Sequence, residues 1–369
     1  MNIAKKEHTM MRVGVMTFHA IANFGAVLQA YALCRALREL GCEAQVIDYQ
    51  PEYLVGIYRH LGRRPNVILN NAIRRWRFAR FRRAFIKTTR RIYRTEDDLR
   101  ANPPDVDVLV CGSDQVWNLK VLQGRLDAGF FLDFLSDRTR RIAYAPSLGD
   151  MPFPGEVQGA VAKLLSRFHA VSIREEVHSD LIHSLTGRKP AHVLDPAFLV
   201  EDYSPVIKEP KGAPDRYLAV YPIEYCPEFN HFVRRLRDAL DMPAVNIGMG
   251  PLPDVDYNCV RLGPSEWLGW MRRASFVCTN SFHGTAFSII FQRDLACFPF
   301  HKRPGLTARI EGLLKQFHLH ERLIANTAEI SDSDVRLKPV DYRVVLPLLR
   351  GAISDSRRYL QNSIFAETD

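Results

Sequence analysis

Residues 277–285 (Val-Cys-Thr-Asn-Ser-Phe-His-Gly-Thr) hold the best candidate for acid–base chemistry. A histidine side chain titrates near neutrality, and His283 lies between a strand-like apolar run and a helical pattern. The free N–H groups at a helix start favour an anion, and Gly284 opens the backbone. The alternative is a structural histidine, but this setting favours a functional one. The polar neighbours are Thr279, Asn280, Ser281 and Thr285.

A second polar segment, residues 111–118 (Cys-Gly-Ser-Asp-Gln-Val-Trp-Asn), follows another apolar run, with Gly112 at the bend. A purely structural turn rarely needs four hydrogen-bonding side chains, so we predict that this loop contacts a ligand. Asp114 is the one group here that can take a proton from a sugar hydroxyl. The other three are Ser113, Gln115 and Asn118.

Residues 23–29 (Asn-Phe-Gly-Ala-Val-Leu-Gln) also join a predicted strand to a helix. Gly25 would let a ligand approach the backbone N–H groups, with Asn23 and Gln29 as polar neighbours. An ordinary turn capped by Asn23 is the alternative. Further candidates for an anion site are four basic residues after other predicted strands: Arg174, Lys302, Arg303 and Arg309. For Lys302 and Arg303 a solvated surface charge is the favoured interpretation.

Alternating apolar strands and helices must position these segments. A strand over 12–18, a helix over 23–40 and a strand over 44–48 form one βαβ unit, which implies a parallel sheet. Further strand-like runs are 106–111, 141–145, 170–173 and 192–194, and after a Pro- and Gly-rich linker at 208–214 they are 217–222, 244–248, 276–279 and 295–298. A helix is expected near 228–240. This order predicts two Rossmann-like, doubly wound α/β domains with the chemistry in the cleft between them.

We place the N-terminal domain at residues 1–205, the C-terminal domain at 206–340, and a final helix over 341–369 that packs back on the first domain. The chain of 369 residues is 47% hydrophobic and 25% charged, as in ordinary globular proteins. Neither a secretory signal nor a membrane span is recognisable, so a cytoplasmic location is predicted. The seven cysteines form no C-x-x-C pair, which argues against a disulfide framework or a zinc site.

Positive charge is concentrated in residues 73–94. Residues 74–94 carry ten Lys or Arg and no acidic residue, and since the whole chain has a net charge of +9, the remainder is left at −1. Aromatic residues at 78, 81 and 85 favour an amphipathic helix within 73–91. It is either a surface helix with inward-facing aromatics, or a patch that contacts an anionic membrane. RNA binding is disfavoured because the rest of the chain is near neutral.

Taken together, these segments resemble the polysaccharide pyruvyl transferase family, in the branch marked by Gly-Ser-Asp-Gln-Val-Trp-Asn. The matching residues, in order, are 23–26 with Gln29, 112–118, 143–147 with Gly149, 172–175, 194–196, 280–285 and 309–310. The resemblance implies a GT-B-like arrangement and transfer of a pyruvyl group from phosphoenolpyruvate to two hydroxyls of a sugar, forming a cyclic ketal. It implies no metal or cofactor besides this donor substrate.

Under this resemblance His283 is the expected acid, or else a phosphate ligand, and Asp114 is expected to activate the acceptor hydroxyl. Family members that form ketals often carry an arginine where this chain has Ser281, and Arg309 or Lys302 are candidates to replace that charge. The residues predicted to bind substrate are Asn23, Gly25, Gln29, Ser113, Gln115, Asn118, Arg174, Asn280, Ser281, Gly284, Thr285, Lys302 and Arg309.

Two other functions remain open from the sequence. A GT-B glycosyltransferase that uses a nucleotide sugar would share the architecture, although the paired glutamates of many such enzymes are not evident. A non-catalytic, glycan-binding member of a polysaccharide assembly system is the other. The expected acceptor is a sugar of a cell-surface polysaccharide precursor, and a lipid-linked oligosaccharide at the inner face of the cytoplasmic membrane would suit the basic segment.

Overall fold

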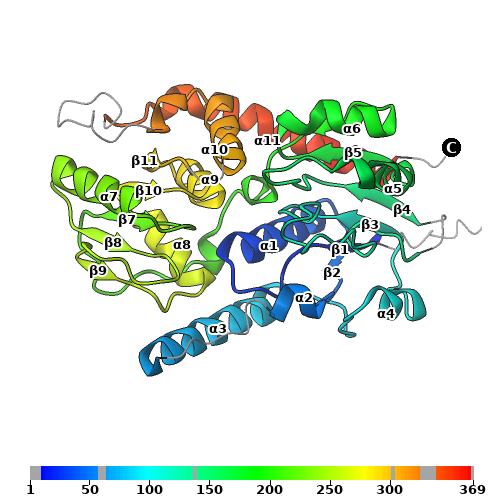
Figure 1. Cartoon of the computed structure of the whole chain (residues 1–369), viewed down its shortest axis with the longest axis horizontal. Helices are drawn as coiled ribbons and strands as arrows, with labels where there is room; N and C mark the ends of the chain where they lie inside the picture. Colours follow the sequence, from blue (N-terminus) through cyan, green and yellow to red (C-terminus); the bar gives the residue numbers. More distant parts are fainter. Residues whose placement is uncertain (1–9, 57–63, 136–138, 301–303, 325–337, 367–369) are drawn as a thin grey trace, which may run out of the picture.

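Two parallel β-sheets lie side by side in the computed structural model, which describes residues 10–56, 64–135, 139–300, 304–324 and 338–366 (Figure 1). The first sheet has the order β2-β1-β3-β4-β5-β6. Its strands are β1 (Arg12–Met16), β2 (Glu43–Val46), β3 (Val108–Cys111), β4 (Arg140–Ala143), β5 (Ala170–Ile173) and β6 (Ala191–His192). The strands are short, and the central strands β1, β3 and β4 are buried apart from the first residue of β1 and of β4, as in sheets that helices cover on both faces.

The second sheet has the order β11-β10-β7-β8-β9, also with parallel pairing throughout. Its strands are β7 (Leu218–Tyr221), β8 (Ala244–Asn246), β9 (Tyr257–Asn258), β10 (Phe276–Thr279) and β11 (Asp294–Cys297). Two parallel, doubly wound sheets confirm the predicted α/β fold class. The predicted boundaries at residues 205 and 340 stay predictions.

Helices connect and cover the strands. In chain order they are α1 (Phe24–Glu39), α2 (Glu52–Val55), α3 (Pro65–Phe85), α4 (Glu96–Ala101), α5 (Gly155–Ser166), α6 (Ser179–Thr186), α7 (Pro227–Leu240), α8 (Pro264–Arg273), α9 (Phe282–Ile290), α10 (Pro304–Gln316) and α11 (Tyr342–Phe365), with 3₁₀ turns η2 (Glu176–His178), η3 (Pro196–Leu199), η4 (Ser204–Val206) and η5 (His320–Arg322). The last helix, α11, returns to the first sheet, where Ser356 Oγ accepts from Leu194 N at 3.0 Å and Tyr359 OH donates to Ala143 O at 3.0 Å.

The strand order puts the polar segments where ligands bind in such sheets. In each sheet the chain adds strands first toward one edge and then toward the other. The order of addition reverses between β1 and β3 in the first sheet and between β7 and β10 in the second. Crevices form outside the carboxyl ends of the strands at these switch points. Residues 23–29 lie beyond β1, 111–118 start at the end of β3, and 280–285 follow β10. The topology therefore brings three of the predicted segments to the two switch points.

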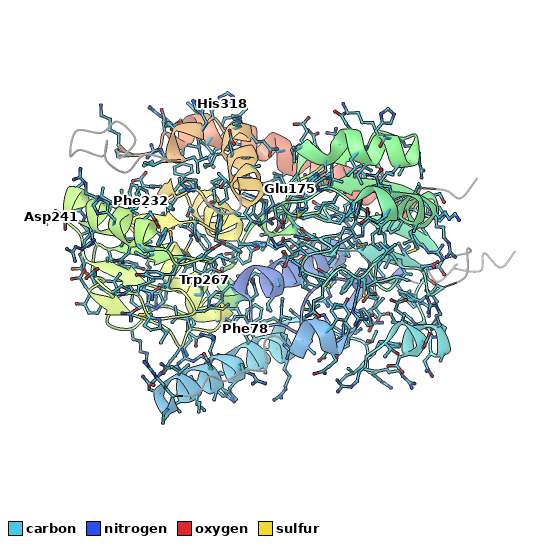
Figure 2. All side chains as sticks on the ribbon, viewed as in Figure 1. Phe78, Glu175, Phe232, Asp241, Trp267 and His318 are labelled. Atoms are coloured by element: carbon cyan, nitrogen blue, oxygen red, sulfur yellow. The ribbon has the colours of Figure 1, made fainter. Side chains whose placement is uncertain are left out.

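Aromatic side chains pack the first turn of α1 against α3 and against α8, which belongs to the second half of the chain. The Phe24 ring stacks on Trp267 of α8, with centroids 5.2 Å apart and planes 14° apart. It also packs on Phe78 of α3 at 5.0 Å, and Figure 2 shows Trp267 and Phe78 close to this junction. All three side chains are buried. The start of α1 is thus held in a fixed position between the sheets.

The basic segment is a helix in its first part and extended in its second. Helix α3 ends at Phe85, and the chain then runs beside β2, with Val46 N bonded to Lys87 O and Thr89 N to Val46 O, each at 2.9 Å. Ile86, Thr88 and Thr89 are β-branched, which favours an extended backbone over a helix. The amphipathic helix predicted within residues 73–91 is thus present and ends at Phe85. Within α3 two of the aromatics are buried, Phe78 and Phe81, whereas Trp76 is 59% exposed.

Candidate active site

His283 lies in the first turn of α9, at the contact between the two sheets. Ser281 caps this helix, because its Oγ accepts a hydrogen bond from Gly284 N at 3.2 Å. The imidazole rests on the backbone of Gly25 in α1, where a Cβ would lie only 2.0 Å from His283 Nδ1. Glycine is therefore required at position 25 by the histidine rather than by a turn. His283 Nε2 is buried and makes no hydrogen bond within the described residues.

Asp195 joins the histidine to the first sheet. Its Oδ2 lies 3.5 Å from His283 Nε2, and it accepts hydrogen bonds from Ser113 Oγ and Arg174 Nη1, both at 2.9 Å. Its Oδ1 accepts from Ala197 N at 3.0 Å. The carboxylate is fully buried. It connects the loop after β3, the end of β5 and the start of α9.

The pKa of Asp195 is held below its usual range. Burial alone would raise this pKa, but the neighbouring His283 and Arg174 and the hydrogen bond from Ala197 N outweigh burial. Asp195 is thus an anion at neutral pH. It can orient the imidazole of His283 and balance its charge when the ring carries a proton.

In the sequence Asp195 is only part of the family segment 194–196, and no role is predicted for it. Its partners Ser113 and His283 are 82 and 88 residues away along the chain, so no local spacing could reveal them. The available signal was a single acidic residue directly after the predicted strand 192–194, and Asp195 is the third residue after β6.

Arg174 is a buried cation with one guanidinium nitrogen still available. Its Nε donates to Glu175 Oε1 at 2.8 Å, and its guanidinium lies 4.3 Å above the Phe282 ring. Burial alone would lower the pKa of Arg174, but the carboxylates of Glu175, Asp195 and Asp114 raise it above its usual value. Arg174 Nη2 is buried without a hydrogen-bond partner in the described part of the chain. A buried, unpaired donor on a fixed cation is a place for an anionic ligand.

Arg309 approaches the same place from α10. Its Nε is also buried without a hydrogen bond among the described residues. Burial and the neighbouring Arg174 lower the pKa of Arg309 to about 10, so it stays charged at neutral pH. Both arginines, with Asp195 and Phe282, line a cleft of about 580 Å³ between the first sheet and α10, which we call the donor cleft. Glu175 of this cleft is labelled in Figure 2 beside α10.

The loop after β3 brings Asp114 toward these arginines. Asp114 adopts a left-handed backbone, φ 67°, and its carboxylate makes no hydrogen bond within the described residues. Its charge acts on both Arg174 and Arg309. Further along this loop, Asn118 Nδ2 donates to Gln115 Oε1 at 2.7 Å, so these two amides are bonded to one another. Asp114 is the one carboxylate of this loop, and it has free hydrogen-bonding capacity within the described residues.

Several predicted binding residues hold the site together from beneath instead of reaching its surface. Gln29 is completely buried, and its amide donates to Thr17 Oγ1 and Ala26 O, both at 2.8 Å. Gly284 packs tightly, since a Cβ there would lie 2.3 Å from Thr279 Oγ1. The Gln29 amide is thus bonded inside the protein and Gly284 is closely packed, and the sequence pattern reveals neither.

Four more of the predicted residues also make internal bonds. Ser113 donates to Asp195, and Thr285 Oγ1 donates to Ser281 O at 3.0 Å. Asn280 Oδ1 accepts from Ile223 N and Asn280 Nδ2 donates to Glu224 O, both at 2.7 Å. Asn23 caps α1, because its Oδ1 accepts from Ala26 N at 3.2 Å. The capping interpretation of Asn23 therefore holds. Lys302 lies outside the described residues.

A Gly25→Ala variant tests the contact between α1 and His283. Its Cβ would displace the imidazole, and because a misplacement of about 1 Å can cost about 10²-fold in rate, we expect a loss of that order. Gly159→Ala in α5 is the matched control, since no atom lies within 4 Å of a Cβ there, and it should gain about 0.5–1 kcal/mol. Activity assays and urea unfolding of both variants provide the measurement. Equal activity of the two variants would contradict the contact.

The site has a buried anion, two cations with unpaired donors and one histidine, all at the junction of two doubly wound sheets. This geometry defines a two-domain α/β protein with unpaired cationic donors in its cleft. In the described residues no cluster of three His, Cys, Asp or Glu side chains could hold a metal ion. Nor does any described helix have the length and apolar character needed to cross a bilayer.

The sequence profile of the polysaccharide pyruvyl transferase family matches residues 23–299. The chain belongs to this family, which is a family of transferases with a polysaccharide acceptor. The match covers α1, the loop after β3, Asp195 and the His283 turn. No curated protein matches the chain in sequence.

Solved structures share the fold at low sequence identity. A putative UDP-N-acetylglucosamine 2-epimerase from Listeria monocytogenes is 11% identical, with 96% of this chain and 91% of that chain covered and a TM-score of 0.50. The UDP complex of MnaA from S. aureus is 13% identical, with 96% and 91% covered and a TM-score of 0.49. Spinosyn forosaminyltransferase SpnP is 13% identical, with 96% of each chain covered and a TM-score of 0.47. The likeness to the Listeria protein shows a GT-B-like arrangement of two domains and nothing about substrate.

Proposed function

We propose that this protein transfers the pyruvyl group of phosphoenolpyruvate to two hydroxyls of a sugar, forming a cyclic ketal in a polysaccharide precursor. The observation that carries the proposal is the pair of unpaired donors, Arg174 Nη2 and Arg309 Nε, in one cleft beside His283. Phosphoenolpyruvate has a phosphate and a carboxylate on adjacent atoms of a small molecule. Two separately held cations suit two anionic groups.

Each arginine has a distinct part in binding the donor. Arg174 is fixed by Glu175 and Asp195, so it presents Nη2 in one direction and is suited to the carboxylate. Arg309 has no ion pair within the described residues and is suited to the phosphate, whose charge would replace the missing partner. The position of Ser281, which is an arginine in many ketal-forming members, is a helix cap here. Arg309 supplies the positive charge instead.

The reaction needs one proton donor and one proton acceptor. A proton adds to the CH₂ carbon of phosphoenolpyruvate, which makes the neighbouring carbon electrophilic. The first sugar hydroxyl forms a C–O bond to that carbon and gives up its proton, and the C–O bond to phosphate breaks. The second hydroxyl then forms the other C–O bond of the ketal, and its proton leaves with the phosphate. The products are the ketal and inorganic phosphate, and the balance needs no metal or redox cofactor.

His283 is the proposed donor of the proton to the CH₂ carbon. Its Nε2 has no hydrogen-bond partner in the described chain, and Asp195 lies 3.5 Å away to orient the ring. Asp114, whose carboxylate is free of hydrogen bonds in the described residues, is the proposed acceptor of the hydroxyl proton. The two groups come from different sheets, so closure of the cleft would bring acid and base to one substrate.

The acceptor is proposed to be a lipid-linked precursor at the inner face of the cytoplasmic membrane. Helix α3 supports this proposal, because it exposes Leu69 and Trp76 among its arginines, by 53% and 59%. Arg80 lies 5.5 Å over the Trp76 ring. Aromatic and basic side chains together are typical of surfaces that contact anionic lipids.

Arg309→Gln should raise the KM for phosphoenolpyruvate by about 10- to 100-fold with a smaller change in kcat, since a charge-assisted hydrogen bond contributes about 1.5–3 kcal/mol. Phosphate release at varied donor concentration gives both parameters. Arg358→Gln, an exposed arginine of α11, is the control and should behave as the wild type. An unchanged KM in the Arg309 variant would refute the assignment of the donor cleft.

A further inference from the structure

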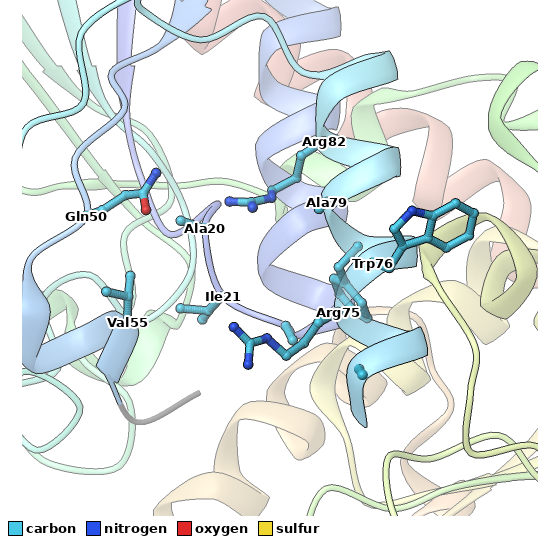
Figure 3. Close-up of a pocket in the computed structure, with 11 residues that line it drawn as sticks. Ala20, Ile21, Gln50, Val55, Arg75, Trp76, Ala79 and Arg82 are labelled. Carbon is cyan, nitrogen blue, oxygen red and sulfur yellow. The ribbon is translucent and has the colours of Figure 1, made fainter. Parts of the chain in front are cut away.

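A second cavity, of about 470 Å³, lies between α3 and the segments that follow β1 and β2 (Figure 3). We call it the α3 cavity. Its polar lining includes Arg75, Arg82 and Gln50, and its apolar lining includes Ile21 and Val55. In Figure 3 the guanidinium groups of Arg75 and Arg82 point into the space from one helix, whereas the Trp76 ring points away from it.

Arg82 has an uncompensated charge in this cavity. The Arg82 side chain is half-buried, and burial lowers its pKa. Within the described residues its guanidinium makes neither a hydrogen bond nor an ion pair. The carboxylate that acts on it belongs to Asp48, whose Oδ1 already receives His19 Nε2 at 2.8 Å and Gln50 Nε2 at 2.6 Å. Beside Arg82 the lining thus offers the Arg75 guanidinium and the Gln50 amide, and the one carboxylate that acts on Arg82, Asp48, is already shared. An anionic ligand would supply the missing charge.

The spacing of the two arginines suits an anion with several oxygens. They are seven residues apart, so they lie on one face of α3 with about 10.5 Å of helical rise between them. Long side chains from two successive turns can approach one ligand from both ends. Guanidinium groups bind phosphate oxygens in pairs, and a diphosphate offers oxygens to both arginines.

Packing contacts through two residues of α1 connect the lining of the α3 cavity to the proposed catalytic histidine. Phe78 of its lining packs on Phe24, and the next residue, Gly25, carries the His283 ring. The donor cleft approaches His283 from Asp195 and Phe282 instead. His283 lines neither cavity, but residues that pack on it or adjoin it connect it to both, Phe24 and Gly25 on one side and Asp195 and Phe282 on the other.

We propose that the α3 cavity binds a phosphate or diphosphate group carried by the sugar acceptor, with Arg75 and Arg82 as its cationic ligands. That the phosphate belongs to the acceptor rests on the function proposed above, whereas phosphate binding in the cavity does not. This site would select activated sugars over free sugars. A lipid diphosphate and a nucleoside diphosphate share this chemistry.

Isothermal titration with inorganic pyrophosphate tests the site directly. Arg82→Gln should weaken binding by at least about tenfold, because it removes one charge-assisted contact. Arg83→Gln, an exposed neighbour on the same helix that does not line the cavity, is the matched control and should bind as the wild type. Arg309→Gln separates the donor cleft, since it should keep pyrophosphate binding at the α3 cavity. Arg82→Lys retains the charge and should bind with intermediate affinity.

Equal binding by Arg82→Gln and wild type would overturn the proposal, as would an equal loss in Arg83→Gln, which would indicate general surface charge. The same titrations with farnesyl diphosphate and with UDP-N-acetylglucosamine identify the source: the probe that loses at least about tenfold in affinity in Arg82→Gln supports the site and names the carrier. Dependence of pyrophosphate binding on Arg82 in a protein that does not bind phosphoenolpyruvate would retain this site and reject the proposed transfer. If the protein binds phosphoenolpyruvate but its pyrophosphate binding does not depend on Arg82, the proposed transfer is retained and the α3 site is rejected.

Discussion

A His283→Gln variant is expected to lose about 10²- to 10⁴-fold in kcat for pyruvyl transfer, the range typical of removing a general acid. Glutamine is polar and of similar reach, but it does not donate a proton to carbon near neutral pH. The fold should persist, because His283 Nε2 has no hydrogen-bond partner in the described chain and Asp195 keeps its bonds to Ser113, Arg174 and Ala197.

The same variant distinguishes the two roles open to this histidine. If His283 is the acid, kcat falls and the Kd for phosphoenolpyruvate stays within about twofold. If it is a phosphate ligand, the Kd rises by about tenfold or more. His183→Gln, an exposed histidine of α6, controls for the loss of an imidazole. Full activity in His283→Gln would remove this residue from the mechanism.

Asp195→Asn should reduce both stability and catalysis. Breaking a buried ion pair by neutralising one partner costs about 3–5 kcal/mol, and here it leaves the buried Arg174 with Glu175 alone. We also expect kcat to fall by about tenfold or more, since the imidazole loses the anion 3.5 Å from its Nε2. Urea unfolding gives the first effect and phosphate release the second, measured at a temperature where the variant is folded.

The pH dependence of stability gives Asp195→Asn an additional readout. Because the folded-state pKa of Asp195 lies below that of the unfolded chain, its stabilisation is present above the unfolded-state pKa of about 3.9 and is lost as pH falls through the folded-state pKa. The variant should therefore differ from wild type most at neutral pH and least in acid. Asp238→Asn, an exposed carboxylate of α7, should show no such convergence. A constant difference at all pH values would argue against a buried anion at position 195.

The regular elements follow from local patterns, and their exceptions have local causes. Strands β5 and β10 match the predicted ranges because each is a short apolar run. Strand β9 was missed since it has only two residues, Tyr257 and Asn258, both exposed. The extended course of residues 86–94 depends on pairing with β2, which is more than 40 residues away and leaves no mark in the helical spacing of the aromatics.

The candidate site was only partly predictable, because polar residues near a turn either face a ligand or serve the fold. His283 was identified from its place between a strand and a helix, yet its contact with Gly25 joins segments more than 250 residues apart. Gln29 and Thr285 have the composition of binding residues but are fully buried and bonded inside the protein. Asp195 gains its importance only from partners in three other segments.

The central claim is that the donor cleft binds phosphoenolpyruvate, and thermal unfolding with separate ligands tests it most directly. We expect millimolar phosphoenolpyruvate to raise the Tm of the wild type by several degrees and to have a much smaller effect on Arg309→Gln, because a ligand that binds only the folded state stabilises it by mass action. A rise in Tm with UDP-N-acetylglucosamine but not with phosphoenolpyruvate, or no rise with either ligand, would contradict the proposed pyruvyl transfer.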